Sequence, residues 1–188
     1  MARIGFKKAK YAKVDGNKYT APAEFEKVVD EKFAPEYNSA ELYANDGLAE
    51  SDYSFKKGTL SVTIADDDDE LLADLFGSNV TKDGGEVVQS INDAAPEVGY
   101  GHVIPKMVGG VRKFKVEFFP RVKFNKVTSD NKTRGESVEF STTALEGTVF
   151  PLDSELNGVP AGVWEKHQTF ASLAEAEAYL DGLLTPAT

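Results

Sequence analysis

The sequence predicts a mainly β protein of the α+β class, folded as one domain with two flanking helices. Most segments alternate apolar and polar residues with the two-residue period of a half-buried strand. Two shorter segments instead carry apolar residues at helical spacing. Glycine-containing turns such as Asp15-Gly16 and Gly109-Gly110 separate the alternating segments. A chain of 188 residues, 41% hydrophobic and 28% charged, is ordinary for a single folded domain over residues 1–188.

The first clear strand is predicted over residues 55–64, after a polar-rich turn that starts near Asn38. Leu60, Val62 and Ile64 share one parity, so they are expected on the buried face, with Thr59, Ser61 and Thr63 opposite.

The longest alternating segment covers residues 112–125. Its apolar set, expected on one face, is Phe114, Val116, Phe118, Val122 and Phe124; the opposite set is Lys113, Lys115, Glu117, Arg121 and Lys123. The strand exceeds the usual 5 to 6 residues or so, and Pro120 cannot donate a ladder hydrogen bond, which predicts an edge strand or a bulge there.

Two further strands are expected toward the C-terminus. One continues the alternation through Val138, Phe140, Thr142 and Ala144 before Gly147. The other runs from Trp164 to Phe170, two aromatic residues that share one parity and are expected on the same face.

Two helices are predicted to pack against the sheet. In residues 67–76 an apolar stripe of leucines ends at Gly77, where a left-handed cap is expected. In residues 173–184, Ser172 and Glu175 have capping-box spacing.

The N-terminal segment and one connection are predicted to lie outside the packed domain. Residues 1–14 are expected to form an N-terminal arm, and the polar residues 126–136 a protruding hairpin loop. The chain has no cysteine, which excludes disulfides, thiolate metal sites and cysteine nucleophiles.

The acidic run 66–70 is the first candidate for a metal site, because hard cations prefer carboxylate oxygens. A helix-loop-helix calcium loop needs glycine at its sixth position, where this chain has Leu71. We therefore interpret these carboxylates as the start of a helix, where the macrodipole favours negative charge, and predict no metal site.

No catalytic or cofactor-binding constellation is evident, so the chain is predicted not to be an enzyme. His102 and His167 lie in separate strand-like segments without a zinc spacing or a nucleophile elbow. Gly99 and Gly101 give only the first half of a dinucleotide fingerprint, and no helix follows them.

Charge indicates self-association rather than nucleic-acid binding. A net charge of -10 opposes nonspecific binding to phosphates. The basic residues that interleave with aromatics in 112–126 are expected to form the outer face of a strand that meets an acidic neighbouring copy. The candidate assembly residues are Lys113, Lys115, Arg121, Lys123, Lys126, Asp130, Lys132 and Arg134. No stretch approaches the roughly 20 apolar residues of a membrane helix.

Residues 38–77, 95–124, 133–151 and 162–180, taken in order, resemble the major tail proteins of long-tailed, non-contractile bacteriophages. The resemblance implies a tail-tube-type β-sandwich or barrel whose copies close into hexameric rings and stack into a hollow tube for DNA ejection. It also implies a tape measure protein, a tail terminator and distal tail or initiator proteins as partners. DNA would pass without specific binding, and no cofactor or membrane would be involved. The protein would belong to the virion tail, assembled in the host cytoplasm.

Two alternatives remain open on the sequence. One is a soluble β-sandwich binding module that holds calcium at 66–70 and a carbohydrate on its loops, although exposed aromatics are not clustered for a sugar. The other is the tube subunit of a contractile injection machine.

Overall fold

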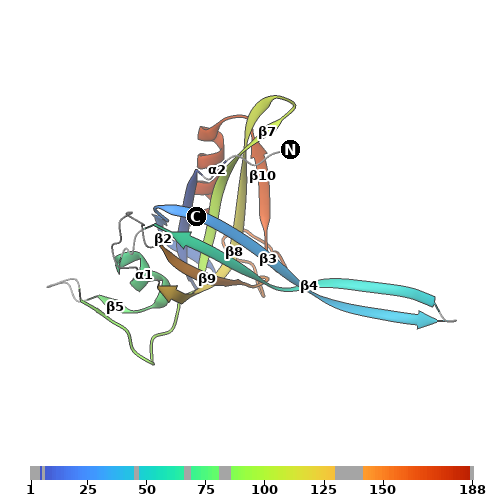
Figure 1. The fold of residues 1–188 in the computed structure, drawn as a ribbon, viewed down its shortest axis with the longest axis horizontal. Helices are drawn as coiled ribbons and strands as arrows, with labels where there is room; N and C mark the ends of the chain where they lie inside the picture. Colours follow the sequence, from blue (N-terminus) through green and yellow to red (C-terminus); the bar gives the residue numbers. More distant parts are fainter. Residues whose placement is uncertain are drawn as a thin grey trace, which may run out of the picture.

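The computed structural model describes residues 5, 7–44, 47–65, 69–80, 86–129 and 142–186, and it confirms a mainly β fold with antiparallel pairing and two helices (Figure 1). The elements are β1 (Lys8–Asp15), β2 (Lys18–Glu24), β3 (Val28–Ala44), β4 (Gly47–Ile64), α1 (Asp69–Phe76), β5 (Asn79–Val80), β6 (Val87–Val88), β7 (Val98–Val108), β8 (Val111–Ser129), β9 (Thr143–Val149), β10 (Lys166–Phe170) and α2 (Leu173–Leu184).

The main sheet curls on itself. Its strand order is β2-β1-β7-β8-β9-β4-β3, with β10 also paired to β8. The first and last strands of this order, β2 and β3, are consecutive in the chain and are joined only by residues 25–27. Both edges of the sheet are therefore held near each other at this corner, as in a partly closed barrel.

The curled sheet has a separate apolar core on each of its two faces. The inner core contains Phe25, Leu60, Tyr100 and Phe124 and is covered at one end by α1. The outer core lies beneath α2 and contains Phe118 among others. The predicted inward set Leu60, Val62 and Ile64 is confirmed, since all three are fully buried.

Helix α1 confirms the prediction for the described part of the acidic run. Asp69 and Glu70 occupy its first turn, where carboxylates complement the helix dipole. Leu75 is buried in the inner core, and Gly77 adopts the left-handed φ of 71° expected of a cap. The helix begins at Asp69 rather than at residue 67, and residues 66–68 lie outside the described part of the chain.

Helix α2 has the predicted start. The Ser172 hydroxyl accepts a hydrogen bond from the Glu175 amide, and the Glu175 carboxylate accepts one from the Ser172 amide, which completes a capping box. Ala176, Leu180 and Leu184 form its buried stripe.

Strand β8 corrects the prediction of a single apolar face. Between β7 and β8, Tyr100 pairs with Phe119 but Val98 pairs with Val122, so β8 has one extra residue at Pro120 and Arg121. This is the predicted bulge, in a strand that has neighbours on both sides.

The bulge moves one parity of side chains from one face of the sheet to the other. Val116 and Phe118 belong to the outer core, whereas Val122 and Phe124, which have the same parity, belong to the inner core. A one-residue slip exchanges the two faces of a strand, which is why alternation alone gave the wrong answer beyond Pro120.

Strand β9 also has the opposite parity to that predicted. Thr143, Leu145, Gly147 and Val149 are buried, and Thr142 is exposed. The strand continues through Gly147 because it lies between β4 and β8, where an added Cβ would come within 2.8 Å of Val122 Cγ1. Val138 and Phe140 lie outside the described residues.

The predicted arm and loop also require correction. Strand β1 begins at Lys8 and pairs with both β2 and β7, so residues 8–14 belong to the sheet and not to an arm. Strand β8 continues to Ser129, so residues 126–129 are strand, and the rest of the predicted loop, 130–136, lies outside the described residues.

Candidate functional site

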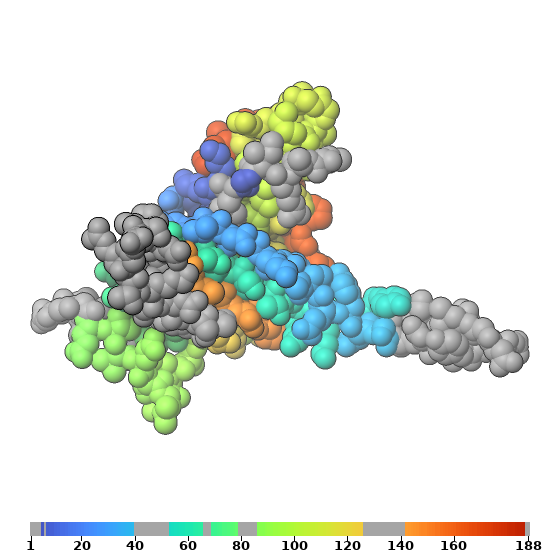
Figure 2. All heavy atoms as spheres, in the orientation of Figure 1, coloured from blue at the N-terminus to red at the C-terminus, as the bar shows by residue number. Residues whose placement is uncertain are grey.

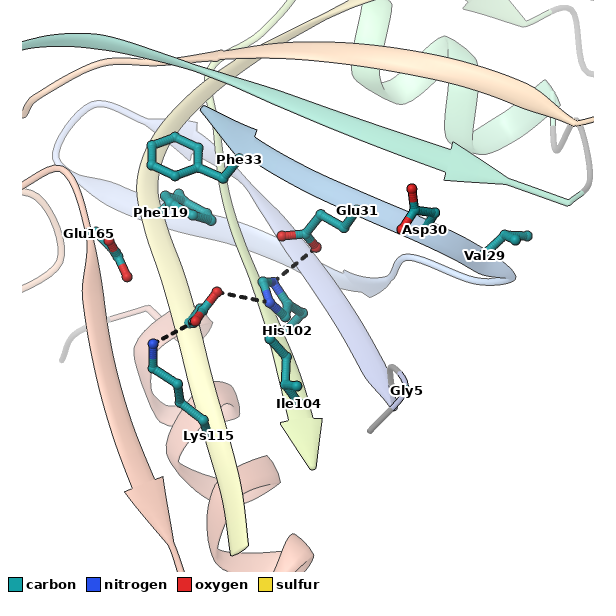
Figure 3. A pocket seen from close by; sticks show the side chains of 11 residues that line it. Gly5, Val29, Asp30, Glu31, Phe33, His102, Ile104, Lys115, Phe119 and Glu165 are labelled. Carbon is teal, nitrogen blue, oxygen red and sulfur yellow. Dashed lines mark hydrogen bonds and ion pairs between the residues drawn. The ribbon is translucent and has the colours of Figure 1, made fainter. Parts of the chain in front are cut away.

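The most unusual feature of the interior is a chain of charged side chains that ties three strands together (Figure 3). His102 on β7 is 1% exposed, and its Nδ1 lies 3.1 Å from Glu31 Oε2 on β3. Its Nε2 lies 3.4 Å from Oε2 of Glu117, which is its direct cross-strand neighbour on β8. Glu31 comes from the far end of the strand order, so this contact exists only because the sheet curls.

Further donors surround the two carboxylates. The Tyr100 hydroxyl donates to Glu31 Oε2 at 2.7 Å, and Lys115 Nζ donates to Glu117 Oε1 at 2.6 Å. We call Glu31, Tyr100, His102, Lys115 and Glu117 the buried charge cluster.

The cluster perturbs the ionisation of its members. Burial is the largest single effect on Glu117 and opposes its ionisation, but the hydrogen bonds and charges of His102 and Lys115 together outweigh it and lower the pKa of Glu117 to about 2. Burial, followed by the charge and hydrogen bond of Glu31, raises the pKa of Tyr100 well above its usual value.

We therefore expect acid to destabilise the fold between about pH 4.5 and pH 2. Because the pKa of Glu117 is lowered in the folded state, its contribution to the free energy of unfolding is fully present above the unfolded-state pKa near 4.5. That contribution is lost as the pH falls toward 2. The shift corresponds to about 3 kcal/mol. Denaturant unfolding at a series of pH values measures the slope of the free energy of unfolding against pH. In Glu117→Gln the part of that slope caused by Glu117 should be missing. Identical slopes in both proteins would contradict the assignment.

A cavity of about 430 Å³ opens beside the cluster. Its lining includes Asp30, Glu165, Ile104 and Phe119, together with Glu31, His102, Lys115 and Glu117 of the cluster (Figure 3). Both imidazole nitrogens of His102 face carboxylates, so the geometry is that of a cross-link between strands. Among the described residues that line the cavity there is no serine, threonine or cysteine that the imidazole could activate.

The other sequence candidates are explained by packing. His167 lies on β10 with its Nδ1 3.3 Å from Glu165, and its side chain is 60% exposed. Gly99 and Gly101 lie within β7, where an added Cβ would come within 2.6 Å of the Tyr19 ring and 2.5 Å of Leu180 Cδ1. These glycines make room for neighbouring side chains. Among the described residues, no group of three His, Cys, Asp or Glu side chains could hold a metal ion.

The predicted basic stripe is divided by the bulge in β8. Lys113 and Lys115 precede Pro120 and lie on the face of Phe119, whereas Arg121 and Lys123 follow it and lie on the opposite face. The four cations therefore do not form one surface. Lys126 lies in β8, and Asp130, Lys132 and Arg134 lie outside the described residues.

Most of these cations are also neutralised within the chain. Arg121 Nε and Nη2 donate to Glu97 at 2.7 and 2.8 Å, and Nη1 donates to Asp153. Lys123 lies 3.3 Å from Glu97, whose pKa is lowered chiefly by the Arg121 hydrogen bond. Lys115 is held by the buried charge cluster.

The feature that sequence reasoning missed is the long hairpin of β3 and β4, which projects from the body (Figure 1). Residues expected to form a polar turn from Asn38 are strand, paired from Val28 with Ile64 out to Ala44 with Gly47. Strand β4 pairs with β9 only from Gly58 onward, so among the described residues the outer part of the hairpin has two strands and two open edges. The signal in the sequence was Asn45-Asp46-Gly47, a turn between alternating runs.

Aromatic side chains hold the base of the hairpin. The Trp164 ring stacks on Phe55 with centroids 4.2 Å apart and on Phe33 at 5.7 Å. Phe33 also packs on Phe119 of β8 at 4.7 Å. The hairpin thus leaves the body from an aromatic base. Tyr37, whose ring packs edge-on against Phe55 at 6.1 Å, is 52% exposed, and Tyr53 is 63% exposed.

No family model matches this sequence, and no curated protein matches it. Within the described part of the chain, neither helix has the length and apolar character needed to cross a membrane.

Proposed function

We propose that this protein is a structural subunit of a phage tail tube, which assembles into stacked hexameric rings around a channel for DNA ejection and has no catalytic role. The observation that carries the proposal is the projecting β3–β4 hairpin, taken together with the resemblance of the sequence to major tail proteins. The other partners would be the tape measure, terminator and distal tail proteins of the same virion.

The hairpin favours assembly for an energetic reason. A two-stranded ribbon is marginally stable alone in water, and open edges invite pairing with another chain. Beyond Gly58 the described ribbon has no third strand, and Phe55, which stacks on Trp164, still belongs to its base. Contact with a neighbouring copy would cover its edges and the exposed Tyr37 and Tyr53.

The charge of the chain suits a conduit for DNA. A net charge of -10 disfavours binding to phosphates, so DNA passing such a surface would not be retained. We expect the assembled form to leave duplex DNA unbound at physiological salt.

We expect the full-length protein to form rings or tubes at high concentration or when its initiator proteins are added. Sedimentation velocity and negative-stain electron microscopy would detect them. The matched control joins Tyr37 to Phe55 through Asn-Gly, which removes the outer hairpin but keeps the aromatic base. This variant should fold with a similar melting temperature and stay monomeric. A wild-type chain that remains monomeric at every concentration and salt level, with its partners present, would refute the proposal.

A further inference from the structure

The turn between β7 and β8 presents a face that is both apolar and cationic. Val108 pairs with Val111 beside the turn, where Val111 is 59% exposed and Val108 is half-buried. Lys106 pairs with Lys113 two positions further from the turn. Residues two apart in a strand lie on the same face, so the two valines and two lysines share one face, which we call the tip face. Arg112 has the other parity and lies on the opposite face.

Folding of a single chain does not account for the cations of the tip face. Lys106 and Lys113 are direct cross-strand partners, and like charges directly opposite one another destabilise a sheet. No acidic residue occurs in 104–116. Among the described residues neither lysine forms an ion pair, whereas Lys8 and Lys13 each lie within 4 Å of a carboxylate. An acidic ligand at this face would reduce the repulsion.

A second segment has the complementary chemistry. Residues 86–96, which we call the acidic loop, contain Glu86 and Asp93 and no lysine or arginine. Ile91 is fully exposed, and Val88 is 48% exposed. Of the six large apolar side chains that the described residues expose, three belong to the acidic loop or the tip face. Apolar groups gathered in this way beside charged residues are typical of interaction surfaces.

Hydrogen bonds order the turn that carries Ile91. The Ser90 amide donates to Asp93 Oδ2 at 2.8 Å, and the Asp93 amide donates to the Ser90 carbonyl at 3.1 Å. Just after the loop, the Val14 amide donates to the Glu97 carbonyl at 2.8 Å, which ties this end to β1. A segment that is ordered before binding loses less conformational entropy in a contact than a flexible one.

The tip face and the acidic loop lie at opposite ends of the body. The β7–β8 turn is at the top, and the loop between β6 and β7 is at the bottom (Figure 1). The space-filling view shows the same separation between the yellow-green atoms of the turn and the light-green atoms of the loop (Figure 2). Contact between the two surfaces therefore requires a second copy.

We propose that the tip face of one copy docks on the acidic loop of a second copy, in a head-to-tail stack. The inference rests on the proposed self-assembly and adds the contact between successive layers. A contact between two different surfaces of identical chains repeats from copy to copy unless a ring closes. The β3–β4 hairpin projects to the side, across the direction of this stack, so it remains available for contacts within a layer (Figure 1).

The proposed contact combines two effects. Val88 and Ile91 of one copy cover the valines of the tip face, which removes apolar surface from water. The carboxylates of the acidic loop lie beside Lys106 and Lys113, and this charge complementarity sets the orientation of the contact.

Charge reversal on each side tests the contact in the full-length chain. The tip variant carries Lys106→Glu and Lys113→Glu, and the loop variant carries Glu86→Lys and Asn92→Lys. Asp93 is kept because its carboxylate orders the turn. At one fixed ionic strength, each variant alone should weaken stacking by about tenfold or more, as measured by sedimentation velocity. An equimolar mixture should recover most of it, because reversed tips then meet reversed loops.

The apolar part of the contact is tested by Ile91→Ala. Because this side chain is fully exposed in the single chain, its loss should leave the melting temperature unchanged. Stacking should nevertheless weaken by about fivefold or more, since the contact loses buried apolar surface. Stacking as strong as that of the wild type would overturn the proposed contact.

The control carries Lys7→Glu and Lys18→Glu, two exposed positions whose reversal changes the net charge by the same amount as the tip variant. Circular dichroism should show that all variants are folded, and negative-stain electron microscopy should show rings without stacks for the tip and loop variants. Stacks in the tip variant as long as those of the control, or a mixture without recovery, would overturn the inference and leave ring formation intact. A wild-type chain that forms no rings would overturn both proposals.

Two other ligands for the tip face are separate outcomes. Cosedimentation with vesicles of phosphatidylcholine and phosphatidylserine, and a mobility shift with duplex DNA, should show no difference between wild type and the tip variant. Tip-dependent binding to either ligand, with stacking unchanged, would assign the tip face to that ligand and overturn the proposed contact.

Discussion

Replacing His102 by leucine is expected to lower the free energy of unfolding at pH 7 by about 3 to 5 kcal/mol. The side chain is 1% exposed and lies between Glu31 and Glu117, whose side chains are 8% and 9% exposed. Leucine would leave both carboxylates buried without the imidazole that contacts each of them. Denaturant unfolding monitored by circular dichroism measures the loss.

The cause of this loss can be separated from a change of packing. Adding Glu31→Gln and Glu117→Gln to His102→Leu replaces the two buried carboxylates by neutral amides. The triple variant should therefore recover part of the lost stability. Lowering the pH from 7 to 5 should also stabilise His102→Leu relative to the wild type, because Glu117 loses the interactions with His102 that lower its pKa and then binds a proton more readily. A triple variant as unstable as the single one would show that shape, not charge, dominates.

Replacing Leu75 by alanine is expected to cost about 2 to 5 kcal/mol, the range for removing a buried leucine side chain. Leu75 is fully buried on α1, where the helix covers the inner core. Because α1 is only 8 residues long, its stability depends on this packing rather than on its own hydrogen bonds. Thermal and denaturant unfolding would measure the change.

Ile91→Ala provides the matched comparison, since Ile91 is fully exposed at 101%. It removes a similar apolar side chain from a position with nothing to pack against, so a change within about 0.5 kcal/mol is expected. A cost for Leu75→Ala below about 1 kcal/mol would show that α1 is not firmly docked on the core.

Local chemistry determined the parts of this fold that were predicted correctly. The Ser172 capping box, the Gly77 cap and the carboxylates at the start of α1 depend on residues within a few positions of each other. Backbone hydrogen bonding and the helix dipole act over that range, so the sequence is sufficient to place them.

Strand pairing decided which face each residue occupies. In β8 the alternation was read correctly as a strand, but the extra residue at Pro120 exchanged the faces of everything beyond it. Pro120 signalled the bulge, yet only pairing with β7 shows how many residues it adds. The basic stripe inferred from one continuous parity is therefore divided between the two faces of the sheet, although Lys113, Lys115, Arg121 and Lys123 lie on the predicted strand. The part of these residues in assembly stays a prediction.

The buried charge cluster and the projecting hairpin were beyond reach of the sequence alone. Glu31 and His102 are 71 positions apart and meet because the sheet curls until β3 approaches β7. The sequence by itself determined the β-rich class, the helices and their caps, because these follow from interactions between near neighbours. Tertiary structure alone decided the faces, the cluster and the open edges, because these depend on which distant strands pair and where pairing stops.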